Sequence, residues 1–163
     1  MIKLTTPLTY EKTKDLKKGD AVLLTGTIFT ARDAAHKKMA EEYSRTGVLP
    51  LKGEVIYYAG PCPKKPGQEI GSVGPTTSYR MDAYASLFCD NGCVYSIGKG
   101  KRNDVAMGAI IKNNGVHFDA IGGAGAYYKN CVKHAEIMLY PELGAEAVYK
   151  LEVVDFPMIV NII

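Results

Sequence analysis

The stretch AVLLTGTIFT at residues 21–30, followed by ARDAAHKKMAEEYSRTG at residues 31–47, decides the predicted fold class. The first stretch is rich in apolar and β-branched residues, which favour a strand. The second consists mainly of good helix formers and ends at Gly47, a residue suited to terminate a helix. Its apolar residues recur at four-residue spacing: Ala35, Met39 and Tyr43. We therefore predict a strand followed directly by a helix with one buried face.

The same alternation recurs along the rest of the chain. We predict further strands at residues 53–59, 94–97 and 116–121, and further helices at residues 81–88, 103–113 and 128–135. The last part of the chain contains two strand-like runs, residues 147–154 and 158–162. Repeated alternation predicts an α/β fold in which helices cover a layered, mostly parallel sheet. The extra strands at both ends of the chain predict a small additional β element packed on that sheet.

Composition narrows the class of protein. The 163 residues suit one domain and no linker divides them, so residues 1–163 are predicted to form a single domain. Hydrophobic residues make up 47% and charged residues 23%, which is typical of a globular protein and excludes a disordered chain. The net charge is only +3 and no five like charges are consecutive, so we expect no nucleic-acid partner.

The sequence also predicts a cellular location. No apolar stretch reaches the roughly 18 residues of a membrane span, and residues 1–20 lack the apolar core of a signal peptide. We therefore expect no membrane partner and a cytoplasmic location, where cysteines stay reduced.

The four cysteines do not form a metal-binding pattern. Cys89 and Cys93 are separated by three residues, whereas zinc sites more often have two, and Cys62 and Cys131 form no second close pair. Free cysteines often behave as small core residues. We predict no metal site made from this chain alone.

Three polar segments follow predicted strands: TGTIFTARDAAH at 25–36, GPTTSYRMD at 74–82 and IGKGK at 97–101. In α/β sheets the loops at the carboxyl ends of strands meet at one crevice. That crevice would contain three cations and three hydroxyl groups: Arg32, Arg80, Lys99, Thr76, Thr77 and Ser78. Arginine binds a carboxylate with two parallel hydrogen bonds and lysine adds a point charge, so this set suits an anionic substrate.

The hydroxyl groups of this set have two interpretations. A nearby guanidinium group stabilises an alkoxide and lowers the pKa of a hydroxyl, which would allow one of them to act as a base. Alternatively, Thr76, Thr77 and Ser78 cap the helix that begins near Tyr79. Arg32 is similarly ambiguous, because a cation at a helix start is unfavourable unless an anion binds there or an acidic neighbour pairs with it. Asp33 and Glu41 are the candidate neighbours.

A glycine-rich run, GGAGA at residues 122–126, lies between a predicted strand and a predicted helix. It lacks the third glycine of the GxGxxG dinucleotide pattern, because Tyr128 occupies that position. We therefore interpret it as a close approach of backbone to a neighbouring element or to the crevice.

Six motifs together resemble one enzyme family. TGTIFTARDAAHK, YYAGPCP, GPTTSYRMD, IGKG, GGAGA and YPELGAEAVYKLEVVDFPMIV occur here in the order found in iron–sulfur hydro-lyases. The chain resembles the β subunit, or C-terminal domain, of class I fumarate hydratase and L(+)-tartrate dehydratase. The resemblance runs from about Leu4 to the C-terminus, and the combination of TARDAAH with GPTTSxRMD is its most specific part.

The resemblance implies a fold, a partner and a cofactor. The corresponding region of the family is similar to a swivelling β/β/α domain. The family's α region holds a [4Fe–4S] cluster on three cysteines, and no such region is present in this sequence. The resemblance therefore implies the beta subunit of a two-subunit enzyme, an αβ or α2β2 hetero-oligomer, with the cluster on the alpha subunit and none bound by this chain alone.

The implied reaction is the reversible dehydration of a 2-hydroxy dicarboxylate, such as malate to fumarate. By resemblance, Thr76 is the base and Arg80 both activates it and binds a carboxylate. Arg32 and Lys99 would bind carboxylates, with Thr77 and Ser78 also in the substrate-binding set. Three further residues are expected to support these: Asp33, His36 and Asp82.

Other functions remain open at this point. L(+)-tartrate differs from malate by one hydroxyl group, and Tyr79 occupies a position that is often small in the family, so the substrate is not fixed. A non-catalytic, anion-binding or scaffold subunit is the alternative from a different class. A solitary domain with a different partner is the third.

Overall fold

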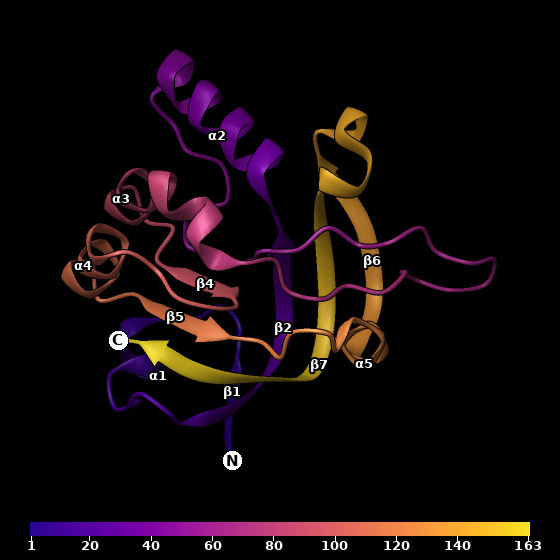
Figure 1. Cartoon of the computed structure of the whole chain (residues 1–163), viewed down its shortest axis with the longest axis horizontal. Helices are drawn as coiled ribbons and strands as arrows, with labels where there is room; N and C mark the ends of the chain where they lie inside the picture. The colour runs from indigo at the N-terminus through magenta and orange to yellow at the C-terminus, as the bar shows by residue number, and fades with distance from the viewer.

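Seven strands form a single sheet that closes on itself in the computed structural model, which describes residues 1–163 (Figure 1). The strands are β1 (Ile2–Thr5), β2 (Ala21–Thr30), β3 (Val55–Tyr57), β4 (Tyr95–Gly98), β5 (Val116–Asp119), β6 (Val132–Leu139) and β7 (Val148–Ile162). Their order is β1-β2-β3-β4-β5-β7-β6, and an additional pairing of β2 with β7 joins β2, β3, β4, β5 and β7 into a closed, barrel-like ring.

The first five strands are parallel, as the strand–helix alternation predicted. β7 is antiparallel to β2 and β5, so it closes the ring in the opposite direction. The fold is therefore α/β with a mixed sheet. Both terminal strands belong to this sheet, β1 beside β2 and β7 beside β5, whereas the sequence predicted a separate small β element.

Two C-terminal predictions differ from the structure. The helix expected at residues 128–135 is α5 (Gly125–Cys131), and the chain turns into strand β6 at Val132. The two runs expected at 147–154 and 158–162 form one continuous strand, β7, because Asp155 adopts a left-handed conformation (φ 51°) that bends the strand without ending it.

Side chains alternate between the two faces of the sheet. Inward-facing residues fill the ring: Leu24, Ile28, Val55, Tyr57, Tyr95, Ile97, Val116, Phe118, Leu151, Phe156 and Met158. Their neighbours, such as Ile56 on β3 and Tyr58 just after it, face outward and pack under the helices. This two-residue period places Ser96 of β4 beside His117 of β5 on the outer face.

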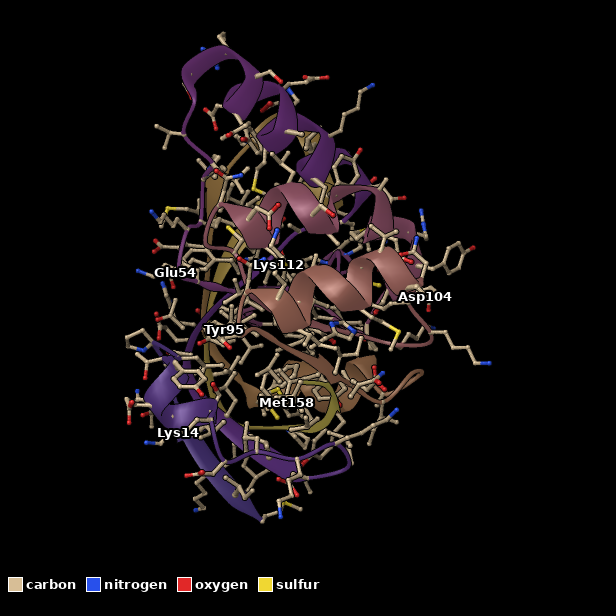
Figure 2. All side chains as sticks on the ribbon, turned by 90° about the vertical axis from the view of Figure 1, so that its left-hand side faces the viewer. Lys14, Glu54, Tyr95, Asp104, Lys112 and Met158 are labelled. Atoms are coloured by element: carbon tan, nitrogen blue, oxygen red, sulfur yellow. The ribbon has the colours of Figure 1, made fainter.

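Helices cover this outer face: α2 (Asp33–Thr46), α3 (Asp82–Asp90) and α4 (Asp104–Lys112). Figure 2 shows α3 and α4 side by side, with Asp104 and Lys112 marking the two ends of α4. The predicted stripe on α2 is confirmed, because Ala35 and Met39 are buried and Tyr43 packs against the same cluster. Gly47 ends α2 with φ 74°, as predicted. None of the helices combines the length and the apolar composition that a membrane crossing requires.

Short elements complete the chain: α1 (Tyr10–Thr13), the 3-10 turn η1 (Ser78–Met81) and the 3-10 segment η2 (Pro141–Glu146). The long connection between β3 and η1 runs outward across β7 and β6 and then returns (Figure 1). Its return brings residues 74–80 back to the ends of β3 and β4, where the candidate site lies.

Candidate functional site

The segment Thr76–Ser78 fits between the diverging carboxyl ends of β3 and β4. The backbone N–H of Thr76 donates to the carbonyl of Tyr58, at 2.6 Å, just after β3 ends. Ser78 N–H donates to the carbonyl of Lys99, at 2.8 Å, and Thr77 pairs with Lys99 in a parallel bridge. The segment thus adds a short stretch of strand, which fixes the position of its backbone.

This pairing places several sequence-predicted residues at one edge of the molecule, which we call the cationic edge: Arg32, Thr76, Thr77, Arg80 and Lys99. Arg32 follows β2, Lys99 follows β4, and Thr76 and Arg80 belong to the returning segment. Arg32, Thr76, Thr77 and Lys99 are half-buried and Arg80 is exposed, and none of them lines the four main cavities, so they form a shallow face at the surface.

Helix capping does not explain the hydroxyl groups. Thr77 is the N-terminal flanking residue of η1 and makes no side-chain capping hydrogen bond. Ser78 is fully buried, and its hydroxyl group hydrogen-bonds to His117. Ser78 therefore lies beneath the cationic edge, which differs from its predicted place among the substrate-binding residues. Thr76 and Thr77 are half-buried.

Arg32 pairs with Glu146, a residue that the sequence analysis did not identify. The Arg32 Nε atom lies 3.6 Å from Glu146 Oε1 but has no hydrogen-bond partner, although it is buried. A Cβ atom on Gly60 would lie only 3.2 Å from that Nε and 2.8 Å from a backbone oxygen. Glycine at position 60 is therefore needed for the guanidinium group to lie against the end of β3. The expected partners Asp33 and Glu41 are not the ones that bind Arg32.

Arg80 instead pairs with Asp33, the first residue of α2. Its Nη2 donates to Asp33 Oδ2, while Asp33 Oδ1 is buried without a partner. The two side chains are 45% and 39% exposed, so the pair stands at the solvent boundary and contributes little to stability. Its structural consequence is to tie η1 to the start of α2, beside Arg32.

Lys99 extends over the glycine-rich turn after β5. A Cβ atom on Gly122 would lie 3.2 Å from Lys99 Cδ, and Gly125 approaches the backbone of Gly74 closely. Both contacts confirm that GGAGA permits close approach, to the neighbouring segment at Gly125 and to Lys99 at Gly122. The turn therefore forms one wall of the cationic edge.

Asp82 and Arg102 form a buried ion pair beneath the returning segment. Arg102 Nε donates to Asp82 Oδ1 at 2.8 Å, and the two side chains are 1% and 7% exposed. Arg102 also donates to the Tyr58 hydroxyl at 2.9 Å, and the backbone N–H of Asn103 donates to Asp82. The pair links the start of α3 and the start of α4 to the end of β3.

Removal of Asp82 is expected to destabilise the protein strongly. Asp82→Ala would leave the Arg102 charge buried without its carboxylate, a change that costs about 3 kcal/mol or more. Asp82→Asn keeps an acceptor for one of the two donors, Arg102 Nε or the Asn103 N–H, and should cost less than Asp82→Ala. Urea unfolding measures both. Equal stability of Asp82→Ala and the wild type would show that the pair does not support this region.

His36 and His117 are both buried inside this layer. His36 Nδ1–H donates to the carbonyl of Arg32 at 2.8 Å, and its ring stacks on Phe88. Burial, together with a smaller effect of the Arg102 charge, lowers the pKa of His36 to about 4 and that of His117 to about 3. Both imidazoles are therefore neutral at neutral pH.

The two buried histidines should make the folded chain less stable in acid. In the unfolded chain they take up protons near pH 6.5, whereas the folded chain resists protonation until about pH 4 or below. The free energy of unfolding should therefore fall as the pH drops from 6.5 to 4, by about 1.4 kcal/mol per pH unit for each histidine. Urea unfolding at pH 7, 6 and 5 tests this, and His36→Phe should reduce the slope by about half. A stability that stays constant from pH 7 to 5 would contradict it.

The four cysteines of this chain are all free thiols. Burial raises the pKa of Cys89 to about 11 and that of Cys93 to about 12, so both are protonated thiols at neutral pH. Cys131 is also buried with a raised pKa, and Cys62 is exposed. No group of three or more cysteine, histidine or acidic side chains is arranged to hold a metal ion.

The fold and the site together define an α/β domain that presents cations and hydroxyl groups at the carboxyl ends of its parallel strands. Comparison with known proteins then identifies the family to which this domain belongs. Residues 1–163 match the family model described as Fumarase C-terminus. The chain therefore belongs to the fumarase C-terminus family.

Named relatives agree with that family. "Fumarate hydratase class I, anaerobic" of Escherichia coli K12 is 43% identical over 138 residues, which are 82% of this chain and 25% of that protein. "Fumarate hydratase 2" of Leishmania major is 43% identical over 143 residues, 85% of this chain and 25% of that protein. "L(+)-tartrate dehydratase subunit beta" of Escherichia coli K12 is 34% identical over 164 residues, 98% of this chain and 81% of that protein.

The chain thus spans about a quarter of the fumarate hydratases that it matches and most of the tartrate dehydratase subunit. These names define a hydro-lyase family, and this chain corresponds to its C-terminal, or beta-type, part. The resemblance noted in the sequence is confirmed at that level.

Proposed function

We propose that this chain is the beta subunit of a two-subunit hydro-lyase that reversibly dehydrates malate to fumarate. One observation carries the proposal: Thr76, Arg80, Arg32 and Lys99 lie at the same strand ends, on a shallow face. The chain would act as one domain that supplies the base and the carboxylate-binding groups. Family membership supports the reaction class, and the free thiols are consistent with a cytoplasmic enzyme.

Charge balance supports an incomplete site. Three cations, Arg32, Arg80 and Lys99, stand against two carboxylates, Asp33 and Glu146, which leaves a local charge of 3 − 2 = +1. A dicarboxylate carries two negative charges, so this face neutralises only part of its ligand. Ligand sites in proteins are usually concave, whereas this face is shallow. A partner chain would both close the face and supply the missing positive charge.

In this proposal the arginines orient the substrate. Arg80 and Arg32 each have free N–H donors beside their acidic partners, and a planar guanidinium group binds a carboxylate with two parallel hydrogen bonds. Lys99 binds the second carboxylate as a point charge. Holding both ends of the diacid would fix the carbon that loses a proton opposite Thr76.

Thr76 then acts as the base. The alkoxide form of a threonine is normally too rare to remove a proton, but guanidinium groups nearby favour the anion and lower the hydroxyl pKa. The Thr76 backbone is already fixed by its 2.6 Å hydrogen bond to Tyr58, so little ordering is needed before reaction. The substrate proton would move to Thr76 Oγ1.

The departure of the hydroxyl group is left to the partner. In this proposal the [4Fe–4S] cluster implied by the resemblance belongs to an alpha subunit. The beta-type relative that this chain covers over most of its length supports such a division, as an αβ or α2β2 assembly. A swivelling motion of this domain against its partner is part of the same proposal.

Reconstitution tests this function. Each chain is purified separately, and the hydration of fumarate is measured for each alone and for the mixture. We expect activity only in the mixture. Substantial turnover by this chain alone would contradict the divided site, and an inactive mixture that still binds dicarboxylate would favour the scaffold interpretation.

L(+)-tartrate is the second candidate substrate. The observation in its favour is the likeness to "L(+)-tartrate dehydratase subunit beta", 34% identical over 164 residues. Tyr79, which is 64% exposed and adjacent in sequence to Arg80, would narrow or reshape the substrate site in this proposal. A comparison of kcat/KM for malate and tartrate in the mixture decides between them.

A further inference from the structure

A row of buried polar side chains lies beneath the Thr76–Arg80 segment and has no role in the steps proposed above. Ser78 and His117 are fully buried and Ser96 is 8% exposed. Burial of polar groups is costly unless each finds a hydrogen-bond partner, and here each does. The row crosses from the returning segment to β5 and then to β4.

His117 is the centre of this row. Its Nε2 atom hydrogen-bonds to the Ser78 hydroxyl at 3.2 Å, and its Nδ1 atom hydrogen-bonds to the Ser96 hydroxyl at 2.7 Å. Both ring nitrogens are therefore engaged, and the ring packs against Tyr58 with centroids 5.9 Å apart. These contacts allow the imidazole only one orientation.

Space for the contact is made by Gly98. A Cβ atom at this position would collide with the Ser78 hydroxyl and would lie 2.8 Å from the Tyr58 ring. Gly98 is the last residue of β4, so its missing side chain lets Ser78 reach His117 across the sheet.

Ser78 lies two residues after Thr76 and two before Arg80. The backbone N–H groups of Thr76 and Ser78 donate to Tyr58 and Lys99, and η1 has no side-chain cap. The Ser78–His117 hydrogen bond is thus the side-chain contact that attaches this short segment to the sheet between its two functional residues. If Ser78 moved, the side chains of Thr76 and Arg80 would change direction together.

We propose that His117 is a positioning residue, which sets the direction of Thr76 and Arg80 through Ser78 without contacting the substrate. This inference rests on the proposed function for the roles of Thr76 and Arg80. A neutral ring suits the task, since burial keeps His117 uncharged at working pH and its hydrogen bonds unchanged.

Two variants separate the two hydrogen bonds of the ring. The amide of Gln reaches the place of Nε2, so His117→Gln keeps the contact with Ser78. The shorter amide of Asn reaches the place of Nδ1, so His117→Asn keeps Ser96 and loses Ser78. Each variant keeps one of the two hydrogen bonds and loses the other, which makes them controls for each other.

Amide hydrogen exchange in the full chain, measured by NMR, is the first test. In His117→Asn the Thr76 and Ser78 amides should exchange about tenfold faster than in the wild type, and in His117→Gln within about threefold. Amides of β2 should be unchanged in both. Identical exchange of Thr76 and Ser78 in the two variants would overturn the proposal, as would an equal acceleration in β2, which indicates a purely structural role.

Kinetics of the assembled complex are the second test. His117→Asn should lower kcat by about tenfold with KM within about threefold, and His117→Gln should restore most of kcat. Equal kcat values for the two variants would overturn the positioning role. If the wild-type complex has no hydro-lyase activity, the proposed function fails, while the exchange experiment still decides whether His117 positions the segment.

Discussion

Replacing Thr76 with alanine is expected to lower kcat of the assembled complex by about a thousandfold, because a positioned base contributes about 10²- to 10⁴-fold to a proton transfer. Folding should be nearly unaffected. The Thr76 contact with Tyr58 uses the backbone N–H, which alanine retains. The hydroxyl group that is lost makes no hydrogen bond within the chain, and Thr76 is only half-buried. The free energy of unfolding should therefore change by less than about 1 kcal/mol.

Thr76→Ser is the matched control, because serine keeps the hydroxyl group and removes only a methyl group. It should retain activity within about tenfold of the wild type. Steady-state kinetics with malate and urea unfolding are measured on the same preparations. A Thr76→Ala variant that is folded and retains most of its activity would remove Thr76 as the base.

Arg80→Lys should lower kcat/KM by about a hundredfold. An ammonium group cannot reproduce the two parallel hydrogen bonds of a guanidinium group, and a charge-assisted pair of this kind is worth about 2–3 kcal/mol. The substitution also alters the ion pair with Asp33, and this pair ties η1 to α2. Lysine would be drawn to that carboxylate and away from the substrate, so KM should rise as well as kcat fall.

Arg45→Lys is the control for the general effect of such an exchange. Arg45 lies in the last turn of α2, its side chain is 72% exposed, and its contact with Glu42 is long at 3.9 Å. This variant should behave as the wild type within about twofold. An Arg80→Lys variant that also keeps more than half of the wild-type kcat/KM would show that Arg80 does not bind the substrate.

The parts of the fold that depend on local periodicity were predictable. β2 and α2 have the expected boundaries within two residues, because an apolar β-branched run and a four-residue apolar spacing are local signals. β6 was missed since most of its residues are exposed and it lacks the alternation that identifies a strand. The ring closure was also missed, because the pairing of β2 with β7 joins residues about 130 positions apart.

The candidate site also has residues that the sequence located and residues that it did not. Arg32, Thr76, Arg80 and Lys99 could be placed together because loops at the carboxyl ends of parallel strands meet. Their catalytic and binding roles remain predictions. Glu146 and His117 could not be found from the sequence, because one comes from the far end of the chain and the other depends on the register of β4 against β5. Ser78 was misplaced because its hydroxyl faces the sheet, a direction that spacing alone does not give.

The central claim is that the cationic edge is one half of a dicarboxylate site. A crystal structure of this chain with its partner and bound malate tests it most directly. The account predicts one carboxylate on the guanidinium groups of Arg80 and Arg32, the other on Lys99, and Thr76 Oγ1 facing the carbon that loses a proton. Malate bound away from these four side chains, or with Thr76 on the opposite side of it from that carbon, would contradict the account.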